Sequence, residues 1–245
     1  MCRLLGYLGV ERSLADLLSG EPHALEVQSW APRRQQHGTI NADGWGVGWY
    51  VEGAPTPARY RTERPMWSDT SFRGMAAQLC TRLAVAEVRS ATPPAPSEES
   101  GVAPFVDGPY LFAHNGVIDG FPDGVGTDLR RALSARRETG LLGAADSEVL
   151  FALALDRLDA GADLAGAVRG AIADVRARTG GRFCVLASDG DRLVGVRAGD
   201  TLWLRALGSG TTVASEPTDD DPAWRELADE TLVTITVDGI AEEAL

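Results

Sequence analysis

The second residue of the chain is a cysteine, and its position gives it unusual chemistry. Cys2 directly follows Met1, and an initiator methionine is removed when the next side chain is small. The mature chain then carries a thiol and a free α-amine on one residue. Because an α-amine has a pKa near ~7.7–8.0, it can act as a general base at neutral pH. Cys2 is therefore a candidate N-terminal nucleophile, although a lone cysteine is as readily a packing residue.

Arg89 is a candidate binding residue at the end of a predicted strand, in Val88-Arg89-Ser90-Ala91-Thr92. An arginine that leaves a strand for a loop can bind a carboxylate through two parallel hydrogen bonds. The alternative for this residue, taken alone, is a surface ion pair.

The sequence His114-Asn115-Gly116 ends a second predicted strand. An asparagine amide next to a glycine N–H places two hydrogen-bond donors in one small space, as an oxyanion hole requires. The alternative for Asn115-Gly116 is an ordinary hairpin turn. His114 is as readily a structural histidine whose hydrogen bonds are satisfied inside the fold.

Two further features have both a structural and a functional interpretation. Asp146 comes just before an apolar helical segment, so it can cap that helix or bind a substrate ammonium group. The run 37–48 contains four glycines, which let the backbone pass close to another strand or to a ligand. Within this run, Asp43-Gly44 taken alone is a turn.

Composition restricts the class of partner. A net charge of −12 over 245 residues disfavours nucleic acid and anionic membranes. The chain has no run of about 18 apolar residues and no signal peptide, so we expect a cytoplasmic protein. Cys2, Cys80 and Cys184 are too few and too scattered for a disulfide framework or a zinc site. We expect no cofactor and no metal, and the oligomeric state stays open.

The elements that must position these residues have an α+β order. Strands are predicted at 4–8, 45–51, 58–61, 83–88, 110–113, 183–188, 192–197, 201–206, 211–215 and 231–237. Helices are predicted at 14–18, from Thr70 or Ser71 to about Cys80, at 147–160 and at 162–178. Loops are expected at 21–42 and 91–109. Two consecutive helices between groups of strands favour helices stacked on sheets, and we expect a single domain over 2–245.

The order of the motifs resembles that of the class II glutamine amidotransferases. The sequence has, in turn, Cys2, His37-Gly38, 43–46, Arg89 with Thr92, 114–116 and Asp146. These proteins are N-terminal-nucleophile hydrolases, and the resemblance implies a four-layer αββα sandwich. It also implies that Cys2 attacks a γ-glutamyl carbonyl while the Asn115 side chain and the Gly116 N–H hold the oxyanion.

The resemblance assigns the remaining residues to a small-molecule γ-glutamyl substrate. Arg89 would bind the α-carboxylate with help from Thr92. Asp146 would accept the α-ammonium, and His114 would belong to the same binding group. The chain has His37-Gly38 where much of the family has Arg-Gly, so His37 receives no catalytic role.

More specific segments resemble one branch of the family, the amidohydrolases of ergothioneine biosynthesis, which act on γ-glutamyl-hercynylcysteine sulfoxide. These segments are 1–6, 31–35, 41–48, 67–72, 88–92 and 103–105. Because no synthase domain accompanies the motifs, we expect hydrolysis, with water resolving the thioester. The alternatives are a glutaminase subunit that passes ammonia to a partner chain, and a silent γ-glutamyl-binding module. Candidates for contact with the leaving group are Trp30, Arg34 and Trp67.

Overall fold

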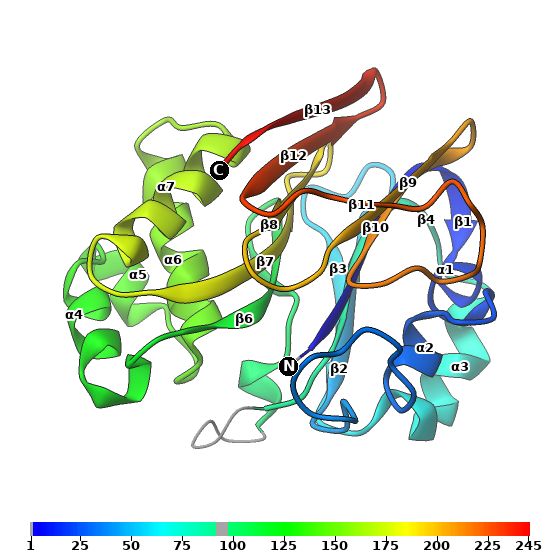
Figure 1. The fold of residues 1–245 in the computed structure, drawn as a ribbon, viewed down its shortest axis with the longest axis horizontal. Coiled ribbons are helices and arrows are strands. Elements are labelled where there is room, and N and C mark those ends of the chain that lie inside the picture. Colours follow the sequence, from blue (N-terminus) through cyan, green and yellow to red (C-terminus); the bar gives the residue numbers. More distant parts are fainter. Residues whose placement is uncertain (1, 92–97) are drawn as a thin grey trace.

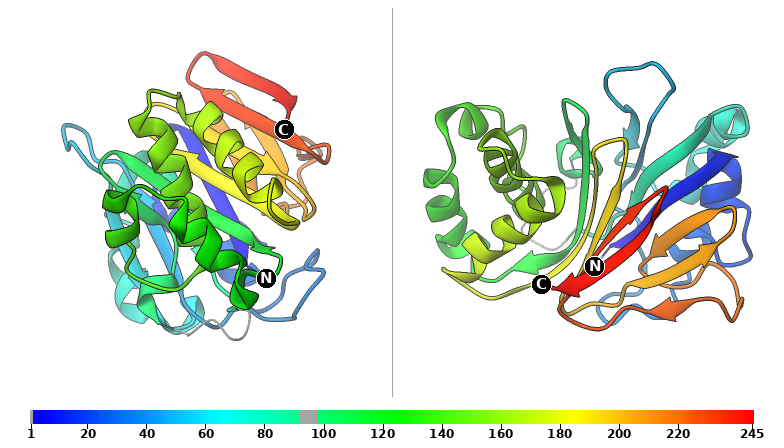
Figure 2. Two further views of the ribbon diagram at one scale, coloured as in Figure 1. Left: turned by 90° about the vertical axis from the view of Figure 1, so that its left-hand side faces the viewer. Right: turned by 90° about the horizontal axis from the view of Figure 1, so that it is seen from above.

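Two antiparallel sheets pack face to face at the centre of the fold, and helices cover the outer face of each (Figure 1). The computed structural model describes residues 2–91 and 98–245. The right-hand view in Figure 2 separates the four layers, with helices at both sides and the sheets between them. The expected αββα sandwich is confirmed.

The first sheet contains the N-terminal strand. Its order is β11-β9-β10-β1-β4-β2-β3. The strands are β1 (Arg3–Ser13), β2 (Trp45–Trp49), β3 (Ala58–Thr62), β4 (Cys80–Val88), β9 (Trp203–Leu207), β10 (Gly210–Ala214) and β11 (Arg225–Glu226). Strand β1 therefore lies inside the sheet, paired with β10 on one side and β4 on the other.

The second sheet has the order β13-β12-β8-β7-β6-β5. Its strands are β5 (Phe105–Asp107), β6 (Tyr110–Ile118), β7 (Gly181–Ser188), β8 (Leu193–Arg197), β12 (Thr231–Thr236) and β13 (Gly239–Ala244). Strand β6 pairs with β7 along its whole length but with β5 only near its start. The end of β6 therefore has one free edge within the described residues.

The helices fall into two groups. Those on the first sheet are α1 (Leu14–Ser19), α2 (Leu25–Gln28) and α3 (Thr70–Ala76), and those on the second are α4 (Val125–Arg131), α5 (Ala135–Thr139), α6 (Asp146–Asp159) and α7 (Leu164–Arg176). Short 3-10 turns are η1 (Met66–Ser68), η2 (Glu99–Gly101) and η3 (Phe121–Asp123). None of the described helices has both the length and the apolar character needed to span a lipid bilayer.

Alternation along β1 and β4 divides the core into two parts. Successive side chains of a strand point to opposite faces. Leu4 of β1 and Val85 of β4 pack in the core between the sheets. Leu5 and Ala84 belong to the separate cluster on the face covered by α1 and α3. The first sheet is thus apolar on both faces, as a strand layer inside a four-layer fold must be.

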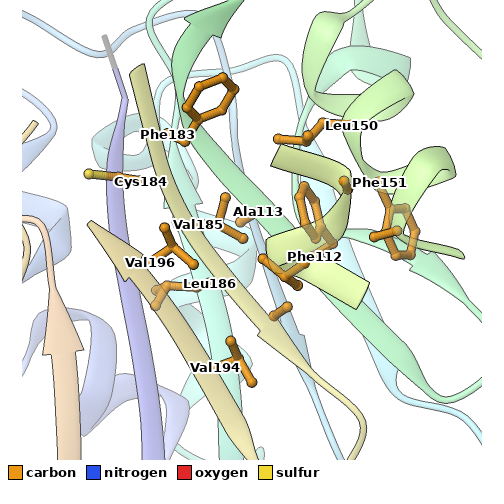
Figure 3. Close-up of a cluster of buried hydrophobic side chains, with 14 of the residues drawn as sticks. Phe112, Ala113, Leu150, Phe151, Phe183, Cys184, Val185, Leu186, Val194 and Val196 are labelled. Carbon is orange, nitrogen blue, oxygen red and sulfur yellow. The ribbon is translucent and has the colours of Figure 1, made fainter. Parts of the chain in front are cut away.

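Helix α6 is fixed on the second sheet by aromatic contacts. Phe112 of β6 stacks on Phe151 of α6 with ring centroids 5.1 Å apart, and Figure 3 shows the two rings side by side. Ala113, the next residue of β6, faces the other sheet (Figure 3). Burying a phenylalanine side chain such as that of Phe112 contributes about 1.5–3 kcal/mol. The N-terminal end of α6 is thereby held close to the end of β6.

Most predicted elements are present, with differences in their bounds. The helices expected at 147–160 and 162–178 are α6 and α7, and the strand expected at 110–113 continues to Ile118 in β6. The helix expected to reach Cys80 ends at Ala76, and its N-cap is Asp69, which accepts a hydrogen bond from the Phe72 N–H. The expected loop at 21–42 contains α2, and the loop at 91–109 contains β5. Helices α4 and α5 and strands β11 and β13 were not predicted.

Candidate active site

A pocket of about 360 Å³ opens where the start of β1 meets the ends of β4 and β6. Cys2, Arg89, His114, Gly116 and Asp146 all line it. Residues predicted from motifs far apart in the sequence therefore meet around one cavity. The remaining binding candidate, the threonine at position 92, lies outside the described residues.

Asn115 is not among the described residues that line this pocket, but its side chain is hydrogen-bonded to Cys2, which lines it. The backbone nitrogen of Cys2 donates a hydrogen bond of 2.8 Å to Asn115 Oδ1. Because this donor fixes which end of the amide is the oxygen, Nδ2 is the free donor. Nδ2 is buried and has no hydrogen-bond partner among the described residues. An unpaired buried donor next to a thiol is what an oxyanion site needs before substrate binds.

Asn115 and Gly116 lie within strand β6, so the hairpin-turn alternative for this motif is wrong. Asn115 pairs with Cys184 of β7, and Gly116 pairs with Phe183. A Cβ atom on Gly116 would lie 1.9 Å from the Arg182 carbonyl oxygen and 2.4 Å from His114 Nε2. Only glycine fits at position 116.

The thiol of Cys2 is half-buried and carries its proton in this arrangement. Burial raises its pKa, and the carboxylate of Glu87 raises the pKa further. The Ser90 carbonyl oxygen lies 3.9 Å from Sγ. Formation of a thiolate at neutral pH therefore requires a group that takes the proton.

Arg89 is buried at 5% exposure, which is not the environment of a surface ion pair. Its backbone N–H donates to the Gly44 carbonyl, and its carbonyl accepts from the Asp43 N–H. The Asp43 carboxylate also accepts a hydrogen bond of 2.8 Å from the Ala91 N–H. A Cβ atom on Gly101 would lie 2.9 Å from the Arg89 guanidinium. The Asp43-Gly44 turn therefore positions Arg89, and Gly101 makes room for it.

Asp146 connects helix α6 to the end of β6. The N-cap of α6 is Ala145, so Asp146 is the first helical residue and not the cap. Its Oδ2 accepts a hydrogen bond of 3.1 Å from the Ile118 N–H, and its Oδ1 accepts one of 2.8 Å from the Ser147 N–H. This places a carboxylate on the pocket wall, in contact with the strand that carries Asn115.

His114 has both ring nitrogens engaged by protein groups. Nε2 lies 3.1 Å from the Arg182 carbonyl oxygen and Nδ1 lies 2.9 Å from Ser147 Oγ. A carbonyl only accepts, so Nε2 carries the hydrogen and Nδ1 accepts from the serine. Burial lowers the pKa of His114, which keeps the ring neutral. These contacts match the structural alternative for His114 and tie β6 to the start of α6.

Glu87 lines the same pocket and was not singled out from the sequence. It lies beside Cys2 in the lining, and its carboxylate raises the pKa of the Cys2 thiol. Burial raises the pKa of Glu87 to about 7, the Asp146 charge adds to this, and the Cys2 thiol and Arg89 oppose it. On one face of strand β4, the residues at 83 and 85 are apolar and the next residue on that face, at 87, is a glutamate. That break in the pattern, two residues before Arg89, was the available signal.

The candidates for contact with the leaving group lie elsewhere. Trp30 and Trp67 contact each other edge to face, with centroids 6.0 Å apart, and Arg34 stacks over Trp203. None of these four is among the described residues that line the pocket. Gly38 comes closer, since a Cβ atom there would lie 3.9 Å from Ser90 Oγ. Within the described ranges, no group of three or more His, Cys, Asp or Glu side chains is arranged to hold a metal ion.

Comparison with known proteins gives a consistent result. The γ-glutamyl-hercynylcysteine sulfoxide hydrolase of Mycobacterium tuberculosis is 41% identical to this chain over 245 residues, covering all of this chain and 97% of that protein. The protein of the same name from Mycolicibacterium smegmatis is 40% identical over 239 residues, covering 96% of each.

Solved structures share the fold. A glutamine aminotransferase class-II domain protein from Silicibacter pomeroyi is 28% identical, with a TM-score of 0.74 and coverage of 99% of both chains. The glutamine phosphoribosylpyrophosphate amidotransferase of B. subtilis is 16% identical, with a TM-score of 0.70 over 99% of this chain and 49% of that one. The family described as class-II glutamine amidotransferases matches residues 1–207. The chain belongs to the class II glutamine amidotransferase family.

Proposed function

We propose that this protein hydrolyses the γ-glutamyl amide bond of γ-glutamyl-hercynylcysteine sulfoxide, with Cys2 as the nucleophile. One observation carries the proposal: Asn115 holds the Cys2 nitrogen through Oδ1 and leaves Nδ2 as a buried donor beside the thiol. The substrate comes from the relatives, two of which bear that name over nearly their full length.

The reaction begins with removal of Met1, which makes the Cys2 nitrogen a free α-amine. Asn115 Oδ1 accepts a hydrogen bond from this nitrogen, so the lone pair of the neutral amine stays free to serve as the general base. The Cys2 sulfur attacks the γ-carbonyl carbon, the C–N bond breaks, and a γ-glutamyl thioester forms. Water then hydrolyses the thioester to glutamate and restores the thiol.

The oxyanion of each tetrahedral intermediate is held by Asn115 Nδ2 and the Gly116 N–H. Both donors are fixed before substrate binds. Asn115 is hydrogen-bonded to Cys2, and Gly116 is held within β6, opposite Phe183 of β7. One such donor is worth about 2.7–4 kcal/mol of transition-state stabilisation. The absence of a side chain at Gly116 lets the carbonyl of the substrate approach the strand.

The glutamyl end of the substrate meets groups of opposite charge in the pocket. Arg89 is buried and fixed by the Asp43-Gly44 turn, so its guanidinium can bind the α-carboxylate in a defined orientation. Asp146, which also lines the pocket, can accept the α-ammonium. His114 acts through Ser147, which it holds at the start of α6. This group recognises any γ-glutamyl compound, so discrimination comes from the leaving group.

The test is release of glutamate from a panel of γ-glutamyl compounds, with Cys2→Ala as the inactive control. We expect kcat/KM for γ-glutamyl-hercynylcysteine sulfoxide to exceed that for glutamine by at least about a hundredfold. Equal values for the two substrates would assign the protein to the glutaminase alternative. Binding without glutamate release, in protein that retains Met1, would assign it to the silent binding module.

A further inference from the structure

Glu87 is a buried carboxyl group in a row of apolar side chains. Leu83 and Val85 of β4 pack in the core between the sheets, and alternation puts Glu87 next on the same face. Leu4 of β1 lies opposite Glu87 in the register of the two strands. Glu87 is 3% exposed. Burying an ionised carboxylate without a partner costs free energy. Such groups are therefore found mainly at functional sites.

The contacts of Glu87 point toward the reacting atoms. Glu87 and Cys2 line the same pocket, and the Glu87 carboxylate raises the pKa of the Cys2 thiol. Its Oε2 is buried and has no hydrogen-bond partner in residues 2–91 and 98–245. The charged groups that act on it are Arg89, which directly follows β4, and Asp146 of α6, joined after maturation by the α-amine of Cys2. Oε2 of Glu87 is therefore an unpaired acceptor on a residue that lines the pocket together with the nucleophile.

The α-amine is poorly placed to accept the thiol proton directly. Amine and thiol belong to one residue, so a transfer between them closes a small ring of N, Cα, Cβ, Sγ and the proton. The S–H···N angle in such a ring is far from linear, and hydrogen bonds weaken steeply below about 120°. Glu87 approaches the thiol from a neighbouring strand and has no such constraint. An amide nitrogen also needs a proton before it can leave.

We propose that Glu87 is a catalytic residue that carries the proton of the Cys2 thiol to the leaving nitrogen. This inference rests on the proposed function and divides its proton transfers between two groups. Glu87 serves formation of the thioester, and the α-amine activates the water that hydrolyses it.

The steps balance as follows. The S–H bond breaks and an O–H bond forms on Glu87, while the sulfur electron pair bonds to the γ-carbon and the carbonyl π pair moves to oxygen. When the oxyanion re-forms the carbonyl, the C–N bond breaks and the nitrogen takes the proton from Glu87. Water then gives a proton to the α-amine and its oxygen to the thioester carbon. The C–S bond breaks, the sulfur leaves as a thiolate, and exchange with solvent moves the proton from the ammonium to the sulfur. A pKa of about 7 for Glu87 means that both of its protonation states are accessible near neutral pH.

The experiment compares two substrates that share the glutamyl half. One is the amide γ-glutamyl-hercynylcysteine sulfoxide. The other is the γ-(p-nitrophenyl) ester of glutamate, whose phenolate leaves without a proton. In Glu87→Gln we expect kcat/KM for the amide to fall about a hundredfold or more, a typical effect of losing a general acid. The ester also needs the thiol proton removed but needs no proton on its leaving group, so its kcat/KM should fall at least about tenfold less than that of the amide.

Glu216→Gln is the matched control. Glu216 is a buried carboxylate outside the pocket, where it accepts hydrogen bonds from the backbone of Arg33 and Arg34. Its substitution should leave the amide-to-ester ratio unchanged. If Glu87 only orients Arg89, both substrates lose equally in Glu87→Gln, and that parallel loss would overturn the inference. Failure of the wild type to cleave the amide would overturn the proposed function instead.

Discussion

The backbone nitrogen of Cys2 and the side-chain oxygen of Asn115 lie 2.8 Å apart, although Cys2 precedes a strand of the first sheet and Asn115 lies in the second sheet. This hydrogen bond connects the first residue of the mature chain, at the start of β1, to the middle of the motif in β6. One amide therefore has two tasks. Its oxygen orients the future α-amine, and its nitrogen is left to stabilise negative charge on the substrate.

The two tasks of Asn115 can be separated by substitution. Asn115→Asp keeps an acceptor for the Cys2 nitrogen but replaces the Nδ2 donor by a negatively charged oxygen. We expect kcat to fall by about 10²–10³ or more. The Kd of the substrate for Cys2→Ala/Asn115→Asp, measured by calorimetry, should stay within about threefold of the Kd for Cys2→Ala. The reason is that Nδ2 stabilises the transition state and not the bound substrate. An Asn115→Asp enzyme with near wild-type kcat would remove Nδ2 from the oxyanion site.

Arg89→Lys tests recognition of the glutamyl carboxylate. Lysine keeps the charge but cannot form the paired hydrogen bonds of a guanidinium. We expect kcat/KM to fall by a factor equivalent to about 1–3 kcal/mol. Arg61→Lys is the control, because Arg61 pairs with Glu99 and does not line the pocket. Equal, small effects of the two substitutions would contradict a role for Arg89 in binding substrate.

The raised pKa of Glu87 predicts a pH-dependent stability. Its pKa is about 7 in the folded protein and 4.5 as the ordinary value, so the folded state binds the proton more tightly. This contribution is fully present below pH 4.5 and is lost as the pH rises through 7. Relative to Glu87→Gln, the wild type should lose up to about 3 kcal/mol of unfolding free energy from pH 4.5 to pH 8. Urea unfolding at both pH values measures this, and a difference between the two proteins that does not change with pH would contradict it.

The three cysteines should differ in their reaction with a diazoketone analogue of glutamine. Such a reagent binds as a substrate does, so it should modify Cys2. Cys80 is exposed but lies outside the pocket, and Cys184 is buried with a pKa raised to about 12 by its burial. Peptide mapping should find the label on Cys2 alone, whereas iodoacetamide should also modify Cys80. Diazoketone labelling of Cys80 at the rate of Cys2 would show that Cys2 is not activated by a binding pocket.

The helices with a regular apolar pattern were predictable from the sequence. Apolar residues at helical spacing gave α6 and α7, and the short helix expected at 14–18 is α1, where Ser13 Oγ accepts a hydrogen bond of 3.1 Å from the Asp16 N–H. Elements with weak patterns were not predicted. Helix α4 begins after Gly124 and contains Gly126, and β13 is exposed along its whole length, so neither has a clear apolar face.

The site was predictable only in part, for a physical reason. Cys2, Arg89 and Asn115 belong to sequence motifs, so their residue types and order could be read directly. The role of Glu87 depends on the alignment of β4 with β1, which brings it beside Cys2. Local sequence does not give the pairing of strands that are about 80 residues apart in the chain. The interaction of Asp43 with the Ala91 N–H was hidden for the same reason.

The central claim is that the mature chain begins at Cys2 and that its thiol carries the glutamyl group during turnover. Intact-mass spectrometry of active enzyme, acid-quenched during steady-state turnover of γ-glutamyl-hercynylcysteine sulfoxide, tests both parts together. We expect a protein that lacks Met1, with a fraction heavier by one glutamyl group that maps to Cys2 and is absent in Cys2→Ala. Fully active enzyme that retains Met1, or in which the glutamyl group maps to another residue, would contradict the account.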